Sequence, residues 1–152
     1  MKQTLMVIFA AMLPALQAAA EPVAVLLAPV PYLMLIPTEI AERLSTAPVS
    51  GPFAQEAAAA GVQSPVTVLY EPEGGTKTIL LSAYYFPEAR FDAAQNPDEP
   101  PPFGKAVIRE RGMALSIAGP HDSIYDAGTP DAANVNAMST LIYEADSYRR
   151  TE

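Results

Sequence analysis

The sequence predicts an α+β fold with a largely antiparallel sheet and two main helices on one face. Strand-like segments outnumber helical ones, and the helical segments mostly follow strands. Short glycine-containing turns join successive strands, which is typical of hairpins and therefore of antiparallel pairing.

Residues 1–20 (MKQTLMVIFAAMLPALQAAA) have the features of an export signal. Lys2 supplies a positive start, an apolar run follows, and alanines at 18–20 suit a signal peptidase. The run is too short to span the roughly 30 Å of bilayer hydrocarbon. We therefore expect cleavage near Ala20, a single domain over residues 21–152, and a periplasmic or secreted location. An N-terminal anchor or an interior helix is the alternative.

The first half of the mature chain alternates between strands and helices. We expect strands at Val23–Ala28 and Tyr32–Ile36, because both are apolar and lie between prolines. Residues 38–45 fit one or two helical turns. A clearer helix follows, with Ser50 as the N-cap and Gly61 as the stop signal.

A hairpin is predicted next, with strands Pro65–Tyr70 and Thr78–Phe86 around the turn at residues 71–75. Strict alternation along the second strand predicts two faces. One carries Thr78, Leu80, Ser82, Tyr84 and Phe86, and the other carries Ile79, Leu81, Ala83 and Tyr85.

The remainder is predicted as a proline-rich surface loop, a second strand pair and a helix. The loop covers residues 91–103, which contain four prolines. The strands are Ala106–Arg109 and Met113–Ala118. The helix starts near Asp131, because apolar residues recur there at three- and four-residue steps. The tail YRRTE is polar.

Composition excludes several classes of function. The 152 residues include no Cys and one His, so disulfides, thiolate metal sites and the usual multi-His metal sites are ruled out. A formal net charge of −8 argues against nucleic acid and anionic membrane surfaces as partners. No phosphate-binding glycine loop, HExxH or GxSxG motif occurs, so no catalytic residue and no metal site is predicted.

Aromatic residues on the predicted strands are the candidate ligand contacts. Tyrosines in a sheet can line an apolar cleft and also offer a hydroxyl. His121, in a loop after a strand, is placed at the rim of that cleft, where it would contact ligand or haem iron. The competing interpretation is ordinary core packing, with His121 as a capping residue. The candidate set is Tyr32, Tyr70, Tyr84, Phe86 and His121.

A resemblance to a known superfamily rests on three stretches between residues 65 and 122. They are PVTVLYEPEGG, TILLSAYYFPEA and DEPPPFGKAVIRERGMALSIAGPHD. This pattern resembles the SOUL haem-binding proteins and the GyrI-like effector-binding domains. The resemblance implies a pseudo-twofold α+β fold around a ligand cleft, with haem as a cofactor in some members. Members continue beyond the last helix with further strands, so the second repeat is expected to be incomplete here.

Three functions follow as hypotheses. The first is an exported, non-catalytic domain that binds a small hydrophobic or aromatic ligand. The second is an interaction or structural module of the envelope without a pocket, which binds another protein or a second copy of itself, because an incomplete sheet leaves an open edge. The third is a haem-binding protein or a hydrolase of the same superfamily. A hydrolase needs a carboxylate of raised pKa, for which Glu71 and Glu110 are the candidates.

Overall fold

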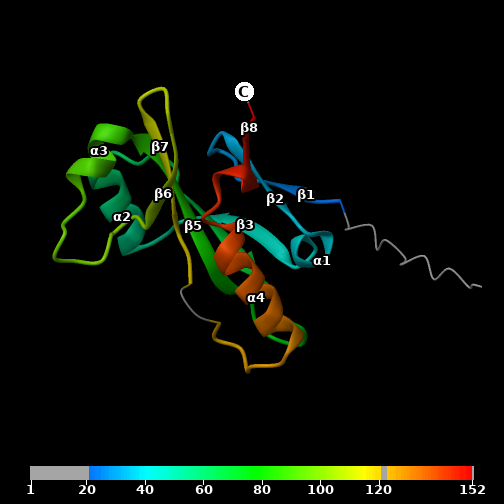
Figure 1. Cartoon of the computed structure of the whole chain (residues 1–152). Coiled ribbons are helices and arrows are strands. Elements are labelled where there is room, and N and C mark those ends of the chain that lie inside the picture. The colour runs from blue at the N-terminus through cyan, green and yellow to red at the C-terminus, as the bar shows by residue number, and fades with distance from the viewer. Residues whose placement is uncertain (1–20, 121–122, 152) are drawn as a thin grey trace, which may run out of the picture.

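The computed structural model describes residues 21–120 and 123–151, so the predicted signal segment and His121 lie outside the described residues. These residues form helices and antiparallel strands, and the α+β class is confirmed (Figure 1). The strands are β1 (Val23–Leu26), β2 (Tyr32–Ile36), β3 (Leu44–Pro48), β4 (Val66–Tyr70), β5 (Thr78–Pro87), β6 (Lys105–Glu110), β7 (Met113–Ala118) and β8 (Tyr148–Arg150). The helices are α1 (Thr38–Ala41), α2 (Pro52–Ala59), α3 (Glu88–Ala93) and α4 (Pro130–Leu141).

The strands form two sheets rather than one. A three-stranded sheet has the order β1-β2-β8, and a five-stranded sheet has the order β3-β4-β5-β7-β6. Within the part of the chain that the structure describes, neighbouring strands pair antiparallel, as predicted. The two sheets are joined through side chains, since β2 residues and β5 residues share one hydrophobic cluster.

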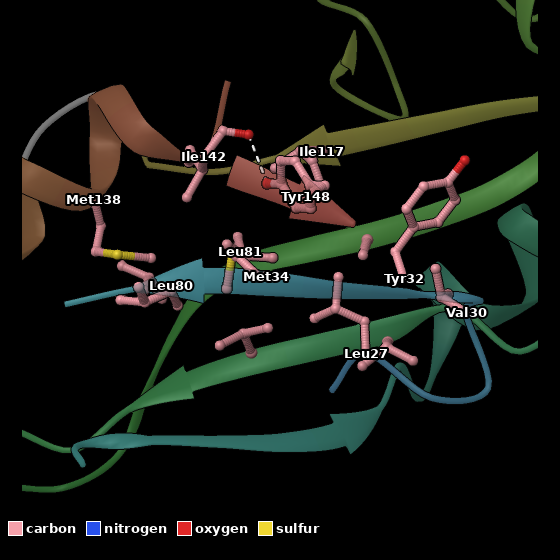
Figure 2. Packing of buried hydrophobic residues seen from close by; sticks show 14 of the residues in the cluster. Leu27, Val30, Tyr32, Met34, Leu80, Leu81, Ile117, Met138, Ile142 and Tyr148 are labelled. Carbon is pink, nitrogen blue, oxygen red and sulfur yellow. Dashed lines mark hydrogen bonds between the residues drawn. The ribbon is translucent and has the colours of Figure 1, made fainter. Parts of the chain in front are cut away.

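The prediction of two main helices on one face is wrong, because helices cover both faces of the five-stranded sheet. On one face, α4 and the three-stranded sheet enclose the larger hydrophobic cluster, which includes Leu27, Met34, Leu81, Ile117 and Met138 (Figure 2). On the opposite face, α2 and α3 pack against Tyr84, Phe86 and Ala114 through Ala57 and Phe91. The cause is β5, which has large apolar side chains pointing to both sides and therefore needs cover on both.

A bulge at the start of β5 changes which residues share a face. Val68 pairs with Leu81 and Leu69 pairs with Ile79, so Leu80 is an extra residue in the ladder. Because one inserted residue reverses the alternation, Leu80 joins the larger cluster with Leu81, and Ile79 points to the other side. The predicted two faces are therefore correct after the bulge and wrong before it.

The segment between β2 and α2 differs from its prediction in two ways. Helix α1 ends at Ala41, and the chain then enters β3, which pairs with β4 along its whole length. The N-cap of α2 is Gly51, with φ of +70°, and no side chain caps the helix. The expected Ser50 cap is wrong because this backbone conformation suits glycine and moves the cap one residue along.

Two further elements were not foreseen. The predicted loop at 91–103 begins within α3, which is anchored by the buried ring of Phe91. The polar tail contains β8, which pairs with β2 through Tyr148, Arg149 and Arg150. A strand therefore does follow α4, in the three-stranded sheet, and the incomplete second repeat stays a prediction.

Candidate functional site

An apolar groove lies on the α2 side of the five-stranded sheet, and we call it the sheet groove. Side chains of β3, β4 and β5 form its floor, and α2 and a proline-rich loop form its walls. It encloses about 440 Å³. Its principal lining residues are Pro48, Phe53, Leu69, Ile79, Tyr84 and Pro102.

Two large apolar side chains in this groove are exposed to solvent. Phe53 on α2 and Ile79 on β5 each remain 68% exposed. Ile124, 74% exposed, lines a smaller cavity that also includes Ile79. Isolated exposed apolar residues are common, but a group of them around a concavity is typical of a binding surface.

The polar groups of the sheet groove are hydroxyls. Thr67 and Ser82 lie on its floor, and Tyr84 stands beside them. Burial raises the pKa of Tyr84 by more than the hydrogen bond with Ser82 lowers it, so the phenol is neutral at physiological pH. Among the described residues that line the groove, none is charged. The groove is therefore suited to an uncharged, mainly apolar group with one or two hydrogen-bonding atoms.

A second cavity, of about 750 Å³, lies on the other side of the proline-rich loop. We call residues 96–103 the proline strap and this space the strap cavity. Phe91, Pro101, Ala106 and Tyr143 contribute to its lining. Lys105 and Arg109 bring cationic groups to it.

The two cations of the strap cavity differ in their partners. Arg109 Nη1 bonds the Glu88 carboxylate at 2.8 Å and the Asp92 carboxylate at 3.0 Å, and its guanidinium lies 5.2 Å from the centre of the Phe91 ring. Lys105 forms no ion pair with any other residue that the structure describes. Lys105 is therefore the cation of this cavity without a carboxylate partner among the described residues, while Glu88 and Asp92 together outweigh the charge of Arg109.

The predicted ligand residues do not gather in one place. Tyr32 and Tyr70 belong to the larger cluster, whereas Tyr84 and Phe86 belong to the cluster on the opposite sheet face. The Phe86 ring packs edge-on against Phe91 and Phe103. Of the four aromatic residues, Tyr84 alone lines the sheet groove.

The Tyr70 hydroxyl connects β4 to α4. It donates a hydrogen bond to Asp131 at 2.6 Å and accepts one from Asn134 at 2.9 Å. Burial, followed by the bond to Asp131, raises its pKa. Because both hydrogen-bonding positions are used within the protein, this tyrosine fits a structural role.

Tyr32 is held in a similar way. Its hydroxyl donates to Glu110, which also receives Arg150 Nη1 at 3.1 Å. Burial and then the Glu110 bond raise the pKa of Tyr32 to about 12. The same tyrosine, followed by Arg150, lowers the pKa of the Glu110 carboxyl. A hydrolytic acid needs a raised pKa, and the hydrogen bonds from Tyr32 and Arg150 act on Glu110 in the opposite direction.

Phe53 and Ile79, the exposed large hydrophobic residues of the groove, were missing from the sequence-based candidates. Phe53 is the one large apolar residue of α2, which is otherwise mostly alanine, and this contrast was an available signal. The sequence carried no such signal for Ile79, because the side of the sheet to which it points depends on the bulge at Leu80.

No group of three or more metal-ligating side chains occurs among the described residues. Within the same residues, no helix has the length and apolar composition needed to cross a bilayer. Comparisons with protein-family models, with curated proteins and with solved structures found no match.

Proposed function

We propose that this protein is an exported domain that binds a small hydrophobic or aromatic ligand in the sheet groove. The observation that carries the proposal is the joint exposure of Phe53 and Ile79 around one concavity. Covering this surface would remove apolar area from water at about 25 cal/mol per Å².

The size and chemistry of the groove support a small ligand. Its volume of about 440 Å³ falls within the range of roughly 300–1,000 Å³ that is usual for small-molecule sites. Such sites combine apolar walls with a few polar atoms, and Thr67, Ser82 and Tyr84 supply hydroxyls here. Membership of the SOUL and GyrI-like superfamily stays a prediction, and the groove supports ligand binding without it.

Export is the second part of the proposal, supported by the charge, length and small residues of the first 20 positions. Expression of the full chain in a bacterium should yield a periplasmic protein that begins at Glu21. A cytoplasmic product that retains Met1 would contradict this part.

The binding proposal is tested by thermal unfolding of residues 21–152 with a panel of hydrophobic and aromatic probes. A ligand at a hundred times its dissociation constant adds about 2.7 kcal/mol to the free energy of unfolding. Ile79→Asp should abolish the shift, because it places a charge on the groove floor. Leu26→Asp is the matched control, since Leu26 is also exposed but lies on β1. The site is refuted if no probe raises the midpoint, or if both variants behave alike.

A second candidate function is binding of an envelope protein along β1. This strand pairs with β2 on one side only, and Val23 and Leu26 on it are exposed. It contains no charged residue, unlike the edge strand β6 with its bulge and its Lys and Arg residues. Charges and bulges protect edges from pairing, so β1 is the less protected edge. If an envelope protein binds along β1, Leu26→Asp should weaken that protein complex and Ile79→Asp should leave it intact, which is the opposite of the result expected for ligand binding in the sheet groove.

A further inference from the structure

We propose that the open edge of β1 pairs with β1 of a second copy of this chain, so that two three-stranded sheets become one six-stranded sheet in a symmetric dimer. This inference goes beyond ligand binding in the sheet groove and does not depend on it. It concerns the edge of the second candidate function, and the oligomeric state of the protein separates a second copy from an envelope protein as the occupant.

The backbone of β1 directs the hydrogen-bonding groups of two residues away from the molecule. Within the described part of the chain, β1 has β2 as its one neighbour in the sheet (Figure 1). The Leu27 amide donates to the Tyr32 carbonyl of β2 at 3.0 Å, in the same register as the β1–β2 ladder. Because backbone groups point to alternate sides along a strand, every second residue before Leu27 also faces β2. Ala24 and Leu26 therefore face outward.

One register of two antiparallel copies pairs all of these outward groups. With Val25 opposite Val25 of the second copy, Ala24 lies opposite Leu26 in both halves, and four hydrogen bonds form. A register centred on Ala24 would place Leu26 opposite Pro22, which has no N–H to donate. A register centred on Leu26 would place Ala24 opposite Ala28, which lies outside β1. The two-fold axis therefore passes through Val25.

The side chains of β1 suit the same register. Leu26 is 55% exposed and lies beside Leu33 of β2, and in the dimer it meets the small Ala24 side chain of the second copy. On the other side of the sheet, Val25 packs against the larger cluster and meets Val25 of the second copy. Cross-strand pairs of β-branched side chains stabilise a sheet. Pairing therefore covers exposed apolar surface in both copies at once.

The distribution of charge favours β1 as the place where two acidic copies meet. Residues 22–38 contain no charged side chain, although the whole chain has a net charge of −8. Antiparallel pairing of β1 therefore places no like charges opposite each other. Of the other edge strands among the described residues, β6 and β8 contain arginines and β3 ends in Pro48. Charges and prolines oppose strand pairing, and β1 contains neither.

Sedimentation equilibrium of residues 21–152 tests self-association, over about 10 to about 1,000 μM because a small interface gives a weak dimer. Leu26→Asp should raise the dissociation constant at least about tenfold, since it places a carboxylate in the paired edge of each copy. Ile79→Asp is the matched control, because Ile79 is also exposed but lies on β5 in the sheet groove. This control should dimerise as the unchanged protein does.

Single cysteines then locate the two-fold axis, because the chain has no cysteine of its own. In the proposed register the two Val25 Cα atoms lie about 4.5 Å apart, within the range that a disulfide spans. The two Ala24 Cα atoms lie roughly 8–9 Å apart, beyond that range. Under a mild oxidant, Val25→Cys should form disulfide-linked dimers. Ala24→Cys should not, although position 24 is the more exposed of the two.

Three results would overturn the dimer. A protein that stays monomeric at the highest concentration excludes self-pairing and leaves the β1 edge to an envelope protein. An undiminished dimer in Leu26→Asp shows that the copies meet elsewhere. Equal cross-linking of the two cysteine variants excludes the register centred on Val25. Ligand binding in the sheet groove is measured by thermal unfolding with the probes, so failure of the dimer leaves the proposed function standing, and failure of every probe leaves the dimer standing.

Discussion

Three side chains from three strands meet where the two sheets approach each other. Tyr32 is on β2, Arg150 on β8 and Glu110 on β6, and both Tyr32 and Arg150 donate hydrogen bonds to the Glu110 carboxylate. The Arg150 guanidinium also lies 5.9 Å from the centre of the Tyr32 ring. Bonds to an ionised acceptor are stronger than neutral ones, so this group links the sheets best while Glu110 is charged.

The link predicts a loss of stability in acid. The pKa of Glu110 in the folded protein lies below its ordinary value of 4.5, because Tyr32 and Arg150 stabilise the carboxylate. A lowered folded pKa contributes stability that is complete above the unfolded pKa and is lost as the pH falls through the folded pKa. Urea unfolding between pH 6 and pH 3 should therefore show a decline that is smaller in Glu110→Gln. An identical decline in both proteins would assign the acid sensitivity to other carboxylates.

The same residues show what the sequence can and cannot predict about single side chains. Tyr32, Tyr70, Tyr84 and Phe86 were predicted on strands, and all four lie there. Their polar partners were beyond prediction, because Glu110 is 78 residues from Tyr32 and Asp131 is 61 residues from Tyr70. Each tyrosine therefore carried the same sequence signal, although two are held by carboxylates and one lines a groove.

At the scale of elements, the proline strap enters β6 through a glycine that permits close packing. Gly104 has φ of +67°, and a Cβ atom there would overlap the carbonyl oxygen of Ile117 on β7. Just before it, the Phe103 ring packs against Tyr84 and Phe86. The strap is therefore fixed to the sheet at its C-terminal end, between the two cavities.

Replacement of Gly104 by alanine should lower the free energy of unfolding by more than its positive φ alone explains. Gly112 in the β6–β7 turn has φ of +74° and open space around it, so Gly112→Ala should cost about 1–2 kcal/mol for the left-handed conformation. Gly104→Ala should exceed this by roughly 1–3 kcal/mol, because the methyl group must displace backbone. Chemical denaturation of both variants measures the difference. Equal losses of stability in the two variants would show that the backbone around Gly104 moves readily to admit the methyl group.

Elements with strong local patterns were predictable, and those defined by pairing were not. The bounds of β7 and the position of β2 match the sequence analysis, since both are apolar runs between turn residues. Helix α3 was hidden because its six residues lie directly before a proline-rich stretch. The bulge in β5 was hidden because it is a property of the β4–β5 register and of no single segment.

At the scale of the whole molecule, the short C-terminal strand completes the fold. β8 pairs with β2, whose other side is taken by β1. Tyr148 on β8 is buried in the larger cluster, and its hydroxyl donates to the Ile142 carbonyl at the end of α4 (Figure 2). The last residues of the described chain thus connect a sheet edge, a helix end and the core.

This position predicts that removal of residues 148–152 disrupts the tertiary structure well beyond the terminus. The deletion takes away the Tyr148 ring, at a cost of about 3–5 kcal/mol for a buried aromatic residue, and uncovers the edge of β2. Such a loss is a large part of the usual 5–15 kcal/mol of a small domain. We expect weakened near-UV circular dichroism, a broad thermal transition and binding of a hydrophobic dye, with far-UV signal largely retained. Arg149→Ala is the control, because Arg149 is exposed within the same strand and should leave the transition sharp. A truncated protein that unfolds as cooperatively as the full chain would show that the core closes without β8.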